Sequence, residues 1–171
     1  MIEQLSLSIS DGGLSAVGNI VNEGKNSFVA RYNFTSDISW VTRKLNVDVE
    51  KAGKKKMLNL ESNGKGQWVS NFQPAPHLHG ALDVDLSASP FTNTLPICRL
   101  NLKEKQTQEI QVVYVMVPEL EISLKKQRYT CIVPHERYLF EQPPDNFSQE
   151  ILVDEDNLVT VYPKLFRRIK C

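Results

Sequence analysis

The chain has 171 residues, of which 41% are hydrophobic, and 20 basic residues balance 20 acidic ones. This length supports one hydrophobic core, so we expect a single domain over residues 1–171. A net charge of zero argues against a nucleic-acid-binding surface, which normally carries a basic excess. No run approaches the roughly 20 apolar residues of a membrane span, and the N-terminus does not resemble a secretory signal. We therefore expect a cytoplasmic protein.

The first strand signals are runs in which apolar and polar residues alternate with a period of two. The clearest lie at residues 5–9, 28–34, 41–49 and 109–117, and shorter β-branched or aromatic runs lie at 97–102, 120–124, 128–133, 147–153 and 158–162. Turn residues such as Asn63-Gly64 between these runs favour hairpins. We place no helix of useful length. Because an open sheet would expose long edges, we predict an all-β, single-domain antiparallel meander closed into a roll or barrel-like fold.

Arg43 lies in phase with four aliphatic residues of the predicted strand 41–49, namely Val41, Leu45, Val47 and Val49. An inward-pointing arginine must pair with a carboxylate, extend to the rim along apolar surface, or line a wet pocket. The sequence leaves the structural and the ligand-binding interpretations open.

Two basic runs are present. They contain Lys51, Lys54, Lys55 and Lys56 around Gly53, and Arg167, Arg168 and Lys170 near the C-terminus. We interpret them as a solvated hairpin tip and a solvated tail. A membrane-surface or nucleic-acid patch is the alternative.

The histidines and cysteines provide little evidence for chemistry. His77 and His79 form an H-x-H motif, but no third metal ligand is marked. Cys98, Cys131 and Cys171 are widely spaced, which favours free thiols. The G-x-G-x-x-G, P-loop and G-x-S-x-G patterns are absent from the sequence. We predict no catalytic residue, no metal and no cofactor.

Asp83 and Asp85 are in phase in the segment LDVDL, about 6 to 7 Å apart along one strand. They could form a solvated face, pair with arginines, accept hydrogen bonds from sugar hydroxyls, or act as a general acid and base. The residues that follow, from Pro90 to Leu100, hold Thr92, Asn93 and Thr94 between two prolines. We predict a rigid, extended loop here, which either recognises a polar ligand or fills a structural gap.

Several separated segments together resemble a known family. They are LDVDLSASPFTNTLPICRL (82–100), VPELEISLKKQRYT (117–130) and LVTVYPKLFRRI (158–169), with ARYNFTSDISWVTRKLNV (30–47) and GQW (66–68) agreeing in order. The chain is similar to the bacterial proteins called putative glycolipid-binding proteins. That resemblance covers nearly the whole chain and implies a spiral β-roll, a role in glycolipid binding and no catalytic residues.

The resemblance also marks recurrent polar positions. These are Asp37, Trp40, Arg43, Asp83, Asp85, Thr92, Asn93, Thr94, Arg99, Gln127, Arg128 and Tyr129. The sequence departs from the family pattern at Cys98, where an arginine commonly precedes Arg99, and in its short beginning.

We therefore predict a module that binds a glycolipid or another amphiphile, with acyl chains in the apolar interior and the polar headgroup on a cluster of side chains. The predicted ligand-binding residues are Arg43, Asp83, Asp85, Asn93, Arg99, Arg128, Trp40 and Tyr129. Trp40 and Tyr129 would stack on a sugar, or they fill the core.

Two alternatives come from other classes of protein. An enzyme acting on a sugar or lipid would use Asp83 or Asp85 with Arg43 or Arg99. A structural or interaction module would pair an exposed sheet edge with another chain, and a homo-oligomer is compatible with this alternative.

Overall fold

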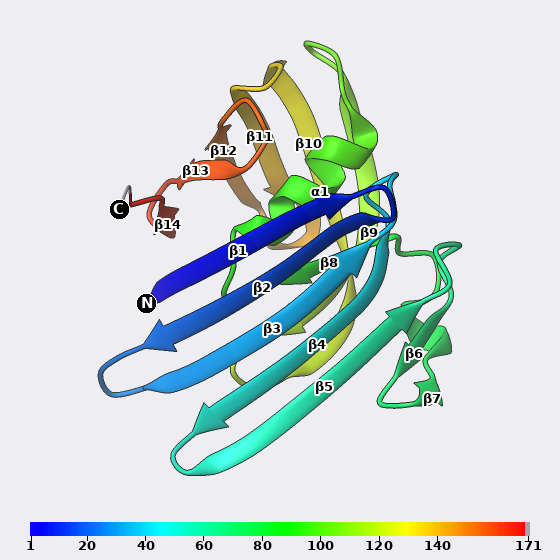
Figure 1. Ribbon diagram of the computed structural model, residues 1–171. Helices are drawn as coiled ribbons and strands as arrows, with labels where there is room; N and C mark the ends of the chain where they lie inside the picture. Colours follow the sequence, from blue (N-terminus) through cyan, green and yellow to red (C-terminus); the bar gives the residue numbers. More distant parts are fainter. Residues whose placement is uncertain (170–171) are drawn as a thin grey trace.

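The computed structural model describes residues 1–169, which form two seven-stranded sheets with one α-helix between them (Figure 1). Lys170 and Cys171, which the sequence analysis considered, lie outside the described residues. The N-terminal sheet contains β1 (Ile2–Ser10), β2 (Gly13–Asn22), β3 (Phe28–Ser36), β4 (Thr42–Lys51), β5 (Lys54–Ser62), β6 (Trp68–Ser70) and β7 (Gln73–Pro74). These strands are antiparallel and lie in chain order, as expected for a meander.

The C-terminal sheet curls behind the N-terminal one (Figure 1). In spatial order it contains β14 (Phe166–Arg167), β13 (Val159–Tyr162), β12 (Phe147–Val153), β11 (Arg137–Gln142), β10 (Glu121–Val133), β9 (Thr107–Met116) and β8 (Asp83–Leu86). Strands β9 to β14 again form an antiparallel meander. The predicted all-β, roll-like fold is confirmed, and the runs predicted at 120–124 and 128–133 are parts of the single strand β10.

Strand β8 departs from the meander because it pairs with β9 in parallel. Parallel neighbours cannot be joined by a hairpin and need a crossover connection. The crossover contains the α-helix α1 (Phe91–Leu100). Two short 3₁₀ turns, η1 (Pro76–Leu78) and η2 (Pro143–Asp145), complete the elements of residues 1–169.

The helix α1 corrects three expectations: that the chain contains no helix of useful length, that residues 90–100 form a rigid extended loop, and that residues 97–102 form a strand. Threonine, asparagine and an internal proline all disfavour a helix interior. Tertiary burial outweighs this preference, because residues 91–97 are all buried. The Ser89 hydroxyl also accepts a hydrogen bond from the Phe91 N–H (3.2 Å), and the helix ends at the left-handed Asn101 (φ 45°).

Helix α1 separates two hydrophobic cores. The first core fills the space between the sheets and includes Tyr32, Phe34, Trp68, Phe91 and Leu95. The second lies on the other face of the C-terminal sheet and includes Ile97, Tyr129, Phe140, Ile151 and Tyr162. None of the helices in residues 1–169 is long and apolar enough to span a membrane.

Tyr32 depends on a glycine opposite it. Its hydroxyl donates a hydrogen bond to Glu3 Oε1 (2.8 Å) and lies 3.2 Å from Ser89 Oγ, so it connects β1, β3 and the approach to α1. The ring lies directly over Gly18 of β2, and a Cβ atom at position 18 would overlap its edge. Only glycine therefore fits at this position.

We expect Gly18→Ala to destabilise the fold by about 1–3 kcal/mol, because the fully buried Tyr32 ring has no free space to move into. Urea unfolding followed by tryptophan fluorescence measures this change. Gly12→Ala is the matched control, since a Cβ there meets only Ser10 Oγ at 3.8 Å. Equal stability of the two variants would show that the ring can shift.

Candidate functional site

Seven polar side chains from β8, α1 and β10 meet on the face of the C-terminal sheet that carries the second core. We call this group the polar cluster, and it consists of Asp83, Asp85, Thr92, Asn93, Arg99, Gln127 and Tyr129. The alternation of β8 puts both aspartates on this face, as the sequence predicted. Helix α1 then places its polar residues against them.

Asp83 and Arg99 form a two-pronged ion pair. Arg99 Nε donates to Asp83 Oδ1 (3.0 Å), and Arg99 Nη2 donates to Asp83 Oδ2 (2.6 Å). Asp83 is fully buried, and the Arg99 side chain is 16% exposed. Burial raises the pKa of Asp83, and the Arg99 guanidinium opposes part of that rise. Of the uses open to Asp83, the structure therefore shows pairing with arginine.

Asp85 occupies a second, half-buried position in the polar cluster. Its carboxylate accepts hydrogen bonds from Gln127 Nε2 (2.5 Å) and Thr92 Oγ1 (3.2 Å). Burial raises its pKa, whereas the two hydrogen bonds and the charge of Lys125 act in the opposite direction. Unlike Asp83, Asp85 has no guanidinium partner in the cluster.

The remaining members form a buried chain of hydrogen bonds behind Asp85. Asn93 Nδ2 donates to the Tyr129 hydroxyl (2.9 Å), which donates to Gln127 Oε1 (3.4 Å). Burial and the charge of Asp85 raise the pKa of Tyr129 well above its ordinary value. The Tyr129 ring packs against Phe140 in the second core, with 5.2 Å between ring centroids.

Arg43 and Trp40 lie away from the polar cluster. The expectation that Arg43 points inward with Leu45 is wrong, because β4 contains a register shift that breaks the alternation beside Arg43. Its side chain is 44% exposed, donates to the Asn63 carbonyl (2.8 Å) and lies 3.8 Å from Asp37. Trp40 occupies the turn before β4 and packs against the first core.

Arg128 is also outside the polar cluster. Strand alternation turns it to the face of β10 opposite Gln127 and Tyr129. There it lies 3.8 Å from Glu141 of the neighbouring strand β11. The structure therefore brings together five of the eight predicted ligand-binding residues and places three elsewhere.

The structure adds residues that the sequence analysis did not select. Lys125 lies 4.4 Å above the centre of the Tyr114 ring and 3.5 Å from Asp145. Its position in phase with Gln127 and Tyr129 on β10 is the sequence signal that could have identified it. Burial is the main cause that raises the pKa values of Tyr114 and Tyr162, and the negative charge of Asp85 raises both further.

An open cleft of about 400 Å³ borders the polar cluster at Arg99. It is lined by Gly80, Leu82, Arg99, Glu109, Ile110, Gln111 and Lys126. Lys126 Nζ lies 3.4 Å from Glu109 at this cleft. Both bonds from Arg99 to Asp83 use Nε and Nη2, and within residues 1–169 its Nη1 has no hydrogen-bond partner. We call this cavity the Arg99 cleft.

The described residues contain no group of three or more histidine, cysteine or acidic side chains placed to hold a metal ion. His77 lies in the turn η1, and both His77 and His79 are exposed. Burial raises the pKa of the Cys98 thiol to about 11, which keeps it protonated at neutral pH.

Arg99→Met tests the ion pair, because it leaves Asp83 buried without a partner. We expect a loss of about 3–5 kcal/mol of stability, and we expect the double variant Asp83→Leu/Arg99→Met to recover most of it. Arg128→Met, at a more exposed pair, is the matched control and should cost less than about 1 kcal/mol. Chemical denaturation measures all four proteins, and equal losses for the two single variants would refute this account.

Asp85→Asn tests the buried charge through its pH dependence. Because the pKa of Asp85 is raised in the folded state, the folded protein binds this proton more tightly than the unfolded chain. The aspartate therefore lowers stability increasingly as the pH rises from about 4, its unfolded value, through its folded value. We expect the stability of Asp85→Asn relative to wild type to increase between pH 4 and pH 7 in urea titrations. A stability difference between the variant and the wild type that stays constant from pH 4 to pH 7 would contradict this account.

Comparison with known proteins agrees with this architecture. A family model described as "Putative glycolipid-binding" matches residues 1–168. A crystal structure of a DUF1089 family protein from Pseudomonas aeruginosa superposes with a TM-score of 0.86 and 32% identity, covering 98% of this chain and 92% of that one. A search of curated proteins gives no match. The chain thus belongs to the family described as "Putative glycolipid-binding".

Proposed function

We propose that the protein binds a glycolipid or a related amphiphile, with the polar headgroup in the Arg99 cleft. The observation that carries this proposal is the fixed guanidinium of Arg99 in the cleft wall. The buried Asp83 holds two of its nitrogens, which leaves Nη1 available to a ligand. A guanidinium held in this way loses little conformational freedom when it binds.

The other side chains of the Arg99 cleft suit a sugar. Lys126 donates hydrogen bonds, Glu109 accepts them, and the Gln111 amide does both. Sugar hydroxyls also donate and accept, so they can pair with each of these groups. Two basic groups and one acidic group also allow a phosphate on the headgroup.

Apolar residues continue from this cleft toward the second core. Leu82 and Ile110 line the cleft, and Ile110 packs at the margin of the second core together with Leu100 and Leu102. All four side chains are only partly buried. We assign the hydrocarbon part of the ligand to this margin, because partly exposed apolar surface gains free energy when it is covered.

The other members of the polar cluster take a positioning role in this proposal. Asp83 orients Arg99, whereas Asp85, Asn93 and Tyr129 hold α1 and β10 together behind the cleft. Their polar atoms satisfy one another, which is the usual condition for burial. Arg43 contacts Asn63 and Asp37, Trp40 packs against the first core, and Arg128 lies on the opposite face of β10. These three residues therefore receive no role at the headgroup.

The test uses a glucosyl diacylglycerol with short acyl chains, offered below its micelle concentration. We expect the wild type to retain this probe in native mass spectrometry. Gln111→Ala/Lys126→Ala removes two cleft side chains without disturbing Asp83, and we expect it to weaken binding about fivefold or more.

Lys103→Ala is the matched control, since Lys103 is exposed and lies outside the cleft. Equal binding by the cleft variant and the control would overturn the headgroup assignment. Release of free glucose from the probe by the wild type would instead indicate an enzyme, with the half-buried Asp85 as the first residue to substitute.

A further inference from the structure

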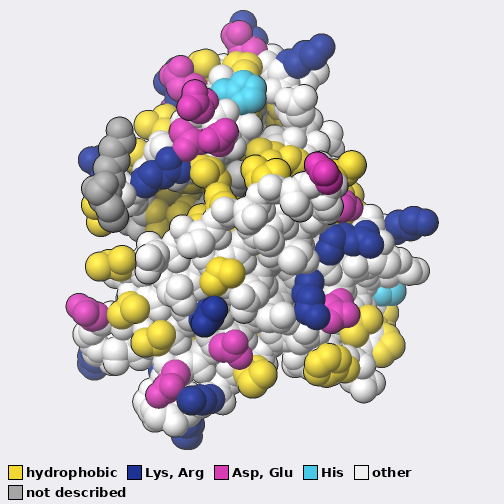
Figure 2. Space-filling view, in the orientation of Figure 1, with side chains coloured by type: hydrophobic (Ala, Val, Ile, Leu, Met, Phe, Trp, Pro, Cys, Tyr) yellow, Lys and Arg dark blue, Asp and Glu magenta, His cyan; other side chains and the backbone are white. Residues whose placement is uncertain are grey.

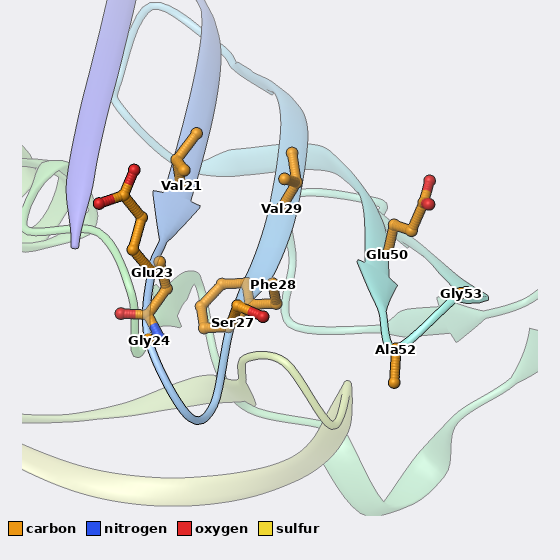
Figure 3. Close-up of a pocket in the computed structure, with 10 residues that line it drawn as sticks. Val21, Glu23, Gly24, Ser27, Phe28, Val29, Glu50, Ala52 and Gly53 are labelled. Carbon is orange, nitrogen blue, oxygen red and sulfur yellow. The ribbon is translucent and has the colours of Figure 1, made fainter.

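One end of the N-terminal sheet combines two hairpin tips with a second open cleft. The tips are residues 22–28, between β2 and β3, and residues 50–56, between β4 and β5. The cleft between them has a volume of about 420 Å³ and is shown in Figure 3. Val21, Phe28, Val29 and Ala52 line it together with Glu23 and Glu50. We call this region, with Ile2, the hairpin end.

The hairpin end has an exposed apolar row on its outer face. Strand pairing places Ile2 beside Val21 and Val21 beside Val29, so the row crosses three neighbouring strands. These side chains are 67%, 42% and 52% exposed, respectively. The same register continues to Glu50 and Lys55 on β4 and β5. Apolar side chains are visible on this outer face in Figure 2, with charged side chains at the tips.

The hairpin end is also basic. Its two tips contain five lysines against two glutamates, in a chain whose formal net charge is zero. Lys51 pairs with Glu119 at 3.2 Å, and Lys55 lies 3.9 Å from Glu50. Lys25 and Lys54, one on each tip, are exposed and have no acidic partner within the part of the chain that the structure describes.

This combination selects one kind of partner. Apolar side chains beside lysines are the pattern of proteins that lie on anionic lipid surfaces, where the apolar groups enter the headgroup region and the lysines meet lipid phosphates. A second copy of the chain would bring the same excess of lysines against itself, which electrostatic repulsion disfavours. Charge complementarity therefore favours a lipid surface over self-association.

We propose that the hairpin end docks the protein onto an anionic lipid bilayer. Ile2, Val21 and Val29 supply the apolar contact, and the exposed Lys25 and Lys54, one on each tip, supply the attraction. This interaction goes beyond the binding of a single amphiphile and does not use the Arg99 cleft.

Flotation with vesicles tests the docking. Vesicles of phosphatidylglycerol and phosphatidylcholine should carry the wild type, whereas vesicles of phosphatidylcholine alone should carry much less. Lys25→Glu/Lys54→Glu should weaken binding about 25-fold or more, because each lysine near an anionic surface contributes about a fivefold factor and the two factors multiply. Val21→Ser/Val29→Ser should remove the binding that persists at high salt.

Lys103→Glu/Lys105→Glu, which makes the same charge change in the turn before β9, should bind like wild type. Equal flotation of the two charge variants would overturn the proposal. Failure of the wild type to float with anionic vesicles would also overturn it. The proposal would also be overturned if the wild type self-associated with rising concentration and, of these variants, Val21→Ser/Val29→Ser alone abolished that association. This face would then be an interface between copies of the chain. Gln111→Ala/Lys126→Ala should still float, so failure of the headgroup site and failure of docking give different results.

Discussion

The ion pair between Asp83 and Arg99 holds α1 on the C-terminal sheet, and α1 in turn contacts the N-terminal sheet. It fixes the C-terminal end of α1 to β8, while Phe91 at the other end packs edge-on against Phe34, with ring centroids 5.5 Å apart. A helix of ten residues therefore connects both sheets and separates their cores. Removing either charged partner would leave the other in a medium that solvates it poorly, so the pair requires both residues.

Much of the sheet architecture could be predicted from the sequence. Alternation with a period of two identified β1, β3, β4 and β9, and β3 shows the expected pattern of buried residues alternating with more exposed ones along its whole length. The short run at 147–153 identified β12 through its β-branched and aromatic residues. The same rule placed Asp83 and Asp85 on one face of β8. Family resemblance added Arg99, Asn93 and Tyr129, which the structure brings into one network with the two aspartates.

What the sequence could not predict depends on contacts between distant segments. Pro96 and the threonines argue against a helix locally, and only the burial of residues 91–97 against both cores reverses that preference. Arg43 fits the apolar alternation of the sequence, but a register shift in β4 turns its side chain outward. Arg99, the partner of Asp83, lies 16 positions further along the chain, so the residue pattern of β8 alone does not predict this pair.

The chain order of the N-terminal sheet has a consequence for how the protein assembles. Strands β1 to β5 are joined by connections of two or five residues, so each hairpin closes with a small loss of chain entropy. Contacts between the sheets span much more of the chain, since Tyr32 and Ser89 are 57 positions apart. Most strand pairs can therefore form between segments that are adjacent in sequence. The largest loss of chain entropy falls in the step in which the two sheets dock around α1.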